Sequence, residues 1–222
     1  MRFIRRSGAA VVMACIMGLP ASAQVVGTGT GGNFFPFGAG TGTIYQQVYT
    51  SSVFASGPQF VNSFQFFLFS GGGLTLSNAV YTVFLSTTSA AVDGLNTVNL
   101  DANRGANNTL FGTFTLGGVA PSTLVFAGTA FVYDPSAGNL LIDMRISGQT
   151  SEGTAAFRSN NGDAGGVYSR VYNFGTGTSG FGLQTEFLTT PVSTVPEPET
   201  LALVATGLVA LGLIRRRKQR VV

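Results

Sequence analysis

The chain has 222 residues, with 12 basic and 9 acidic side chains and a formal net charge of +3. It contains no histidine, a single cysteine (Cys15) and a single lysine (Lys218). These absences exclude nucleophilic catalysis by a histidine-activated or lysine-activated residue within the body of the chain. They also exclude zinc sites built from cysteine and histidine.

The N-terminus has the order of a cleavable signal peptide. Three arginines lie within the first six residues, an uncharged run covers 8–19, and the small residues Ala21 and Ala23 follow. The run is too short for an ordinary membrane span. We therefore predict a signal peptide at residues 1–23, which signal peptidase removes after Ala23. A lipoprotein signal with Cys15 as the acylated residue is the weaker alternative.

Removing both ends of the chain reverses its charge. Three basic residues lie in the first six positions and five in the last eight, which leaves four arginines against seven acids between 24 and 194, a net charge of −3. The basic character therefore belongs to the targeting segments. The body therefore lacks the positive charge that is typical of proteins that bind nucleic acid.

Short apolar runs follow one another along the body, separated by Gly, Pro, Asn and Asp. After an irregular stretch at 24–43, this pattern predicts nine strands, at 43–49, 59–69, 79–85, 110–116, 122–133, 139–147, 154–158, 167–172 and 181–189. The run at 59–69 is dense enough in Phe to predict a central strand buried on both faces. The clearest alternation, at 139–147, places Asp143 on a solvated face.

Residues Asp134–Gly138 predict a hairpin turn, because Asp caps the turn, Pro presets φ and Gly supplies a positive φ. The body shows no convincing amphipathic helix. We therefore predict an all-β fold, an antiparallel β-sandwich with a jelly-roll-like layout, over residues 24–188. A linker at 189–195 is expected to follow it.

Oxygen-rich loops suggest one metal ion. Asp101 and Asn103 in one loop, and Asp163 in another, supply the hard oxygen ligands that Ca²⁺ prefers. Asp and Asn are also ordinary turn residues. No cofactor is expected, and a calcium site on these three residues is the weaker hypothesis.

Two pairs of tyrosines suggest a carbohydrate platform. Tyr45 and Tyr49, like Tyr168 and Tyr172, are spaced to share one face of a strand. The alternative is that these tyrosines are half-packed in the sandwich, with their hydroxyls in water.

Paired carboxylates could hydrolyse glycosides, and the composition permits them. Asp134, Asp143 and Glu152 are the nearest candidates by strand placement. A turn cap accounts for Asp134 and a solvated strand face for the other two, so we expect no enzymatic activity.

The C-terminus combines a short apolar stretch with a basic end. Residues 200–214 carry no charge, and as a helix they would be about 22 Å long, shorter than the ~30 Å hydrocarbon core. Five cations follow: Arg215, Arg216, Arg217, Lys218 and Arg220. Because positive residues stay on the cytoplasmic side, a transient inner-membrane anchor with the body on the other side is expected.

Directly before this stretch stands Pro196-Glu197-Pro198. Residues 196–220 therefore combine a Pro-Glu-Pro motif, an apolar helix and a basic tail, and this order resembles the PEP-CTERM sorting signal of Gram-negative bacteria. The resemblance implies that an exosortase cleaves near the motif and delivers the protein to the cell surface, the outer envelope or the extracellular matrix. It also implies an association with exopolysaccharide or biofilm.

These observations favour an exported, non-enzymatic surface or matrix protein. The alternative is a lectin-like carbohydrate-binding module, with calcium assistance left open. A carboxylate-based glycosidase is a distant third.

Overall fold

The computed structural model describes residues 21–40, 42–160, 166–173 and 182–192, together with 204, 206–208, 210, 211, 215 and 216. The expected signal peptide therefore lies outside the described residues up to position 20. The apolar stretch at 200–214 is described only at scattered helical positions. None of the helical residues described belongs to a helix with the length and apolar character that a membrane span requires.

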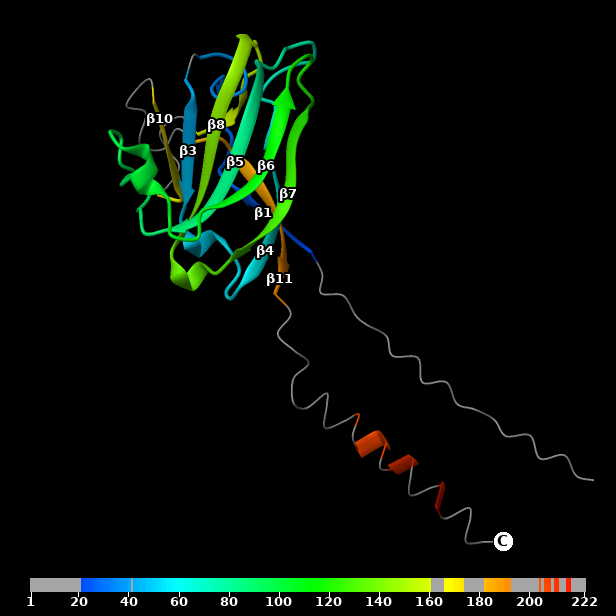
Figure 1. Ribbon diagram of the computed structural model, residues 1–222. Helices are drawn as coiled ribbons and strands as arrows, with labels where there is room; N and C mark the ends of the chain where they lie inside the picture. The colour runs from blue at the N-terminus through cyan, green and yellow to red at the C-terminus, as the bar shows by residue number, and fades with distance from the viewer. Residues whose placement is uncertain are drawn as a thin grey trace, which may run out of the picture.

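The body is all-β and antiparallel (Figure 1). Its strands are β1 (Ser22–Val26), β2 (Gly31–Asn33), β3 (Ile44–Tyr49), β4 (Gln59–Phe67), β5 (Asn78–Thr88), β6 (Thr109–Leu116), β7 (Thr123–Tyr133), β8 (Asn139–Ser151), β9 (Phe157–Ser159), β10 (Tyr168–Tyr172) and β11 (Thr185–Pro191). Three short 3₁₀ turns, η1 (Ser51–Val53), η2 (Leu100–Asn103) and η3 (Pro135–Ala137), interrupt the loops. All nine predicted strands are present, and β1 and β2 are additional.

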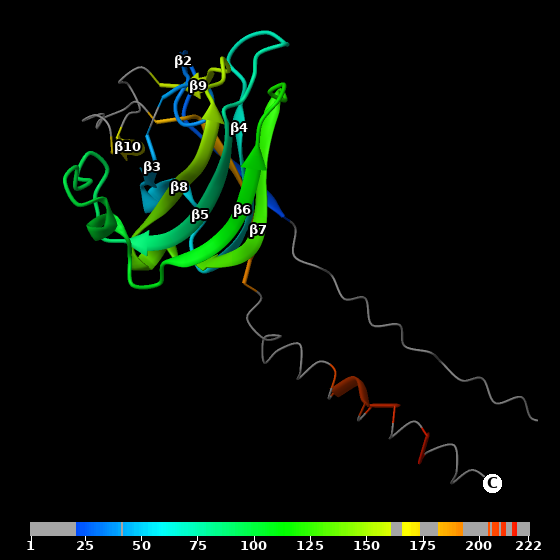
Figure 2. The same cartoon turned by 45° about the horizontal axis from the view of Figure 1, so that its top comes forward.

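Two sheets carry most of the strands, in a sandwich-like arrangement. One has the order β1-β11-β4-β7 and the other the order β10-β3-β8-β5-β6, while β2 and β9 form a separate pair. The first sheet contains strands from both ends of the body, with β1 at its edge and β11 beside it. Figure 2 shows the β2–β9 pair at the end of the body opposite to the end at which β11 finishes.

The core lies between the two sheets. Alternate residues of β4 (Phe64, Phe66) and of β8 (Ile142, Met144) point into it and are buried. Because β4 alternates between buried and partly exposed residues, the prediction that it is buried on both faces is wrong, although it is central in its sheet. Phe37, from the segment before β3, fills the middle of this core.

Phe37 is part of an aromatic cluster. Its ring centroid lies 5.2–5.6 Å from those of Phe66, Tyr81, Phe126 and Phe157. Aromatic pairs at this spacing add a favourable contact beyond their buried area. The segment at 24–43 therefore supplies both an edge strand and a core residue.

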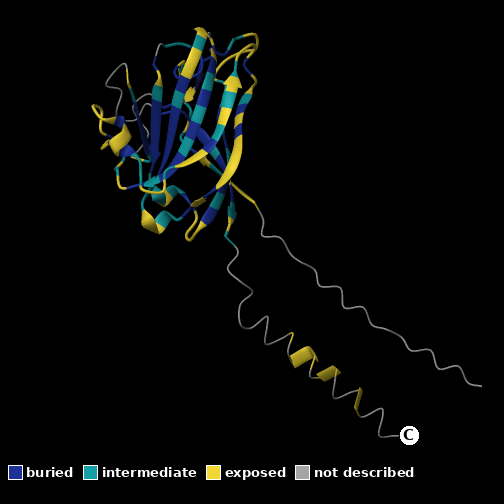
Figure 3. Ribbon diagram, in the orientation of Figure 1, coloured by how far each residue is buried: buried dark blue, intermediate teal, exposed yellow. Residues whose placement is uncertain are grey.

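A loop from Ser89 to Asn108 covers part of the outer face of the five-stranded sheet. Leu95 and Leu100 of this loop pack on Val48, Leu141 and Val171, which point away from the main core. Figure 3 shows β3 buried over nearly its whole length as a result. A sheet face that the sequence pattern assigns to solvent is thus a second small core.

The turn at Asp134–Gly138 forms as predicted, but it is not a hairpin. Asp134 Oδ1 accepts a hydrogen bond from Ser136 N at 2.9 Å, and Gly138 has a φ of +146°. The strands on either side, β7 and β8, belong to different sheets. Local turn chemistry therefore predicted the turn, whereas strand pairing depends on contacts distant in sequence.

The two ends of the body are neighbours in one sheet. β1 pairs with β11, with Ser22 opposite Thr189 and Val26 opposite Thr185. β11 also pairs with β4 as far as Pro191. Strand structure therefore continues three residues beyond the boundary expected at Leu188, into the segment predicted as a linker.

Candidate functional site

The predicted processing residues lie largely beyond the described part of the chain. Ala21 and Ala23 are described and exposed, and Ala23 pairs with Leu188 in the sheet. Cleavage after Ala23 would leave Gln24–Val26 of β1 in place. Arg215 and Arg216 fall at exposed helical positions. The residues Pro196, Glu197, Pro198, Arg217 and Lys218 lie outside the described residues.

Three of the four candidate tyrosines are buried, so the predicted carbohydrate platform is wrong for them. Tyr45, Tyr49 and Tyr168 have no exposed surface. Their hydroxyls bond within the protein: Tyr45 to Gln47 Oε1 at 2.5 Å, Tyr168 to Asn160 Oδ1 at 2.6 Å. They point inward because the face that they share is the core face. Tyr172 alone of the four remains partly exposed.

Gln47 links the two sheets through these buried tyrosines. Its Oε1 accepts from Leu183 N at 2.8 Å, and its Nε2 donates to Leu183 O at 2.8 Å and to Tyr49 OH at 2.7 Å. Tyr49 OH also lies 2.7 Å from Thr185 Oγ1. The buried polar groups of β3, of Leu183 just before β11 and of Thr185 in β11 thus satisfy one another, as buried networks must to be stable.

The candidate calcium ligands are already engaged. Asn103 Oδ1 accepts from Asn96 N at 2.7 Å, and its Nδ2 donates to Gln46 Oε1 at 2.8 Å. Asp101 faces two arginines. Asp163 lies outside the described residues. No cluster of three or more His, Cys, Asp or Glu side chains suited to a metal ion occurs among the residues described.

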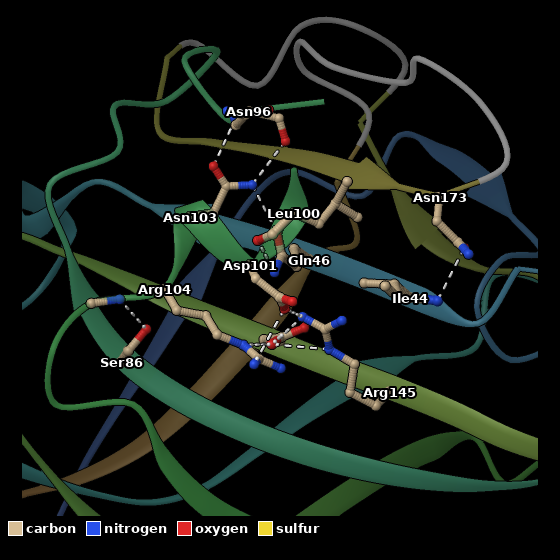
Figure 4. A network of polar contacts seen from close by, with 12 residues as sticks. Ile44, Gln46, Ser86, Asn96, Leu100, Asp101, Asn103, Arg104, Arg145 and Asn173 are labelled. Carbon is tan, nitrogen blue, oxygen red and sulfur yellow. Dashed lines mark hydrogen bonds and ion pairs between the residues drawn. The ribbon is translucent and has the colours of Figure 1, made fainter. Parts of the chain in front are cut away.

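A four-charge network joins the covering loop to the sheet below it (Figure 4). Asp143 Oδ2 accepts from Arg104 Nε at 2.5 Å and from Arg145 Nη2 at 2.9 Å. Asp101 Oδ1 contacts Arg145 Nη2 at 2.7 Å and Arg104 Nη1 at 3.2 Å. The Asp143 side chain is only 1% exposed, so its prediction as a solvated residue is wrong. Two carboxylates balance two guanidinium groups, and the arrangement is suited to holding the loop in place.

The three candidate glycosidase carboxylates do not meet. Asp134 precedes β8, Asp143 lies within it, and Glu152 follows its last residue. At ~3.3 Å per strand residue, Asp143 and Glu152 are separated by more than 20 Å along the strand, far beyond the spacing of paired catalytic carboxylates. Glu152 Oε1 instead accepts from Gly40 N at 3.3 Å.

Arg170 stands out among the charged residues of the body because it is buried without a carboxylate partner. The residue is 7% exposed, and its Nε and Nη1 are buried and make no hydrogen bond within the part of the chain described. The salt bridges found among these residues all involve Arg104 or Arg145. The guanidinium stacks over the ring of Tyr172, with 5.3 Å from Cζ to the centroid.

Arg170 lines a cavity of ≈ 340 Å³. The other walls come from β2 and the turn after it, and from the end of β10: Gly32, Asn33, Phe34, Phe35, Ala39, Gly40 and Tyr172. Phe34 is 50% exposed, whereas Phe35 is buried against Tyr172 with ring centroids 5.6 Å apart. The cavity thus combines a cation with an aromatic wall.

The charge of Arg170 affects the pKa of one buried hydroxyl, that of Tyr45. Burial raises the pKa of Tyr45 to about 12, and the nearby Arg170 guanidinium opposes part of this increase. The sequence contained a signal for this arrangement: Arg170 lies two residues from both Tyr168 and Tyr172, so it shares their strand face. The spacing of the tyrosines predicts a shared strand face, and Arg170 lies between them on that face.

Comparison with known proteins gives one match. A family model described as the PEP-CTERM protein-sorting motif matches residues 194–218. No curated protein and no solved structure matches the chain. The matched segment contains the Pro-Glu-Pro tripeptide, the apolar stretch and four of the cations that follow it, which confirms the resemblance seen in the sequence.

Proposed function

Because the chain carries a PEP-CTERM protein-sorting motif at residues 194–218, which marks an exported exosortase target, we propose the following route to the cell envelope. Signal peptidase removes residues 1–23, and the body crosses the inner membrane. The apolar tail then holds the protein there until an exosortase cleaves near Pro196–Pro198. The product is a protein of the cell surface or extracellular matrix.

The physical chemistry of the tail supports this route. Proline fixes its own φ and restricts the residue before it to extended backbone. The tripeptide therefore favours an extended conformation, which a protease can bind. The apolar stretch that follows is short for a span, and the cations after it favour the cytoplasmic side. Such a segment holds the cleavage site at a defined depth.

For the body, we propose a non-enzymatic role in association with exopolysaccharide or biofilm. The strand order supports a jelly-roll layout, because the two sheets interleave strands from both halves of the chain and β10 adds an outer edge. The paired carboxylates that a glycosidase requires are not brought together among the candidates at positions 134, 143 and 152. A second candidate function, a carbohydrate-binding module, is favoured by the cavity beside Arg170.

The test of sorting is the intact mass of the protein purified from a Gram-negative host with an exosortase. The expected mass corresponds to a chain that begins at Gln24 and ends near Pro196–Pro198. A double variant, Pro196→Ala with Pro198→Ala, should retain the arginine tail. The matched control, Pro191→Ala, removes a proline at the end of β11 and should be processed normally. A wild-type mass that still includes Ile214 and the following arginines would refute exosortase cleavage.

A further inference from the structure

We propose that the cavity beside Arg170 binds a carboxylate-bearing sugar ring, that is, a uronic acid. The proposal deepens the carbohydrate-binding candidate, and it does not depend on how the C-terminal tail is processed. It is built on three features of the described residues: a buried cation without a salt bridge, an amide donor without a hydrogen-bond partner, and an exposed aromatic ring.

The cation defines the charge of the ligand. A guanidinium buried without a counter-ion is unfavourable, because it has lost water and gained no opposite charge. Arg170 lines the cavity, and its Nε and Nη1 are buried and make no hydrogen bond within the described residues. Its planar group matches the geometry of a carboxylate, which accepts strong charge-assisted hydrogen bonds. An anion in the cavity would therefore place an opposite charge beside a guanidinium that forms no salt bridge within the described residues.

Glu152 is hydrogen-bonded to the cavity wall, but its carboxylate does not supply this anion. Glu152 bonds through Oε1 to Gly40 N, a residue of the cavity wall, and forms no salt bridge with Arg170 among the residues described. It leaves Arg170 available and adds negative charge on the Gly40 side. The ligand carboxylate is accordingly expected on the Arg170 side of the cavity.

The remaining walls favour a sugar over a bare inorganic anion. Asn33 uses its Oδ1 to accept from Phe35 N at 3.0 Å, which orients the amide, and its Nδ2 has no partner among the described residues. Phe34 is half exposed and offers a ring on which the apolar face of a sugar can stack. The volume, ≈ 340 Å³, lies at the small end of ligand pockets, which span about 300–1,000 Å³.

The first experiment measures binding to the full chain, purified in detergent, by calorimetry and by thermal melting. The probes are sodium D-glucuronate, D-glucose, sodium acetate and inorganic phosphate at equal ionic strength. Glucuronate should bind and raise the melting temperature, because it stabilises the native state selectively. Glucose should not bind measurably, and acetate should bind more weakly than glucuronate. Equal shifts with all the anions would overturn the assignment to a sugar acid.

Two variants locate the site. Arg170→Met should weaken glucuronate binding about 10- to 100-fold, the range expected for charge-assisted hydrogen bonds. Phe34→Ala should weaken glucuronate but leave acetate unchanged, because acetate has no ring to stack. The matched control is Arg158→Met, which deletes an exposed arginine that lines a different cavity and should bind glucuronate normally.

Stability without ligand separates a binding role from a structural one. Arg170→Met should be at least as stable as the wild type, since it removes an unpaired buried charge. A clear fall in its melting temperature, or unchanged glucuronate binding in Phe34→Ala and Arg170→Met, would overturn the proposal. An oligoglucuronate that binds more tightly than the monomer would assign the site to an acidic polysaccharide, and equal affinity would assign it to the free sugar acid.

Discussion

The carboxylate of Asp143 accepts a 2.5 Å hydrogen bond from Arg104, a contact that joins the middle of β8 to the loop covering its outer face. Arg145 contacts the same oxygen, and Asp101 completes the charge balance. The network therefore connects elements 39 residues apart in the sequence through a buried side chain.

Replacing Asp143 should destabilise the body strongly. Asp143→Asn leaves two guanidinium groups facing a neutral amide, and removing one partner of a buried ion pair costs about 3–5 kcal/mol. Because both arginines keep roughly a quarter of their side-chain exposure, we expect about 2–4 kcal/mol in urea denaturation. The control Asp134→Asn, in an exposed turn, preserves the cap and should change stability much less than Asp143→Asn does. Equal effects of the two substitutions would contradict this role of the network.

Replacing Gln47 should destabilise the protein as much as replacing an apolar core residue does, although glutamine is polar. Gln47→Ala leaves the buried Tyr49 hydroxyl and both backbone groups of Leu183 without their side-chain partner. Each unsatisfied buried group costs about 1–3 kcal/mol, so a loss of about 3 kcal/mol or more is expected. Gln65→Ala, at a half-buried position on the outer face of β4, is the comparison and should cost much less. A loss for Gln47→Ala no greater than that of the control would argue against the bridging role.

The covering loop has one position where only glycine fits. A Cβ added to Gly105 would overlap the carbonyl oxygen of Thr87 at the end of β5. Gly105→Ala should therefore displace the loop and lower stability by about 2–3 kcal/mol, as steric overpacking does. Gly71→Ala, where an added Cβ meets nothing within 4 Å, is the matched control. Thermal melts of the two variants should differ by several degrees, and coincident melts would contradict the close approach.

The buried tyrosines predict the behaviour of the protein in alkali. Burial raises the pKa of Tyr45 from 10.0 to about 12 and raises the pKa values of Tyr49, Tyr81 and Tyr133 as well. The unfolded chain therefore loses these protons first. The stability that these tyrosines contribute is fully present below pH ~10 and is lost as pH rises toward 12 and beyond. Tyrosinate absorbance and far-UV circular dichroism should change together in that range. Early ionisation of most tyrosines in a folded protein would show that they are not buried.

Local sequence patterns predicted the positions of the strands. They did not predict which segments pack against each strand. Alternation in β8 predicted which residues face the core, because side chains in a strand alternate between two faces. It also predicted that Asp143 and Leu141 share the other face. What covers that face is a loop about 40 residues away in sequence, and no periodicity in either segment encodes that contact.

The tyrosines illustrate the same limit at the candidate site. Their spacing predicted a shared face for Tyr168 and Tyr172, and the structure places Tyr168 inside and Tyr172 partly exposed at the same strand's end. Spacing tells which residues lie together, whereas exposure depends on where the strand ends and what packs there. Arg170 lies in the same pattern, but its lack of a salt bridge within the described residues can be seen only in three dimensions.

The pairing of β1 with β11 places the two ends of the body side by side. The two strands run antiparallel at one edge, so Ser22 and Thr189 emerge at the same pole. A chain held by either of its ends is thus held from that pole. The β2 strand, with Gly32 and Asn33 of the cavity wall, lies at the opposite pole (Figure 2). With the attachment at the C-terminal end that is proposed above, the cavity therefore lies at the pole of the body farthest from the point of attachment.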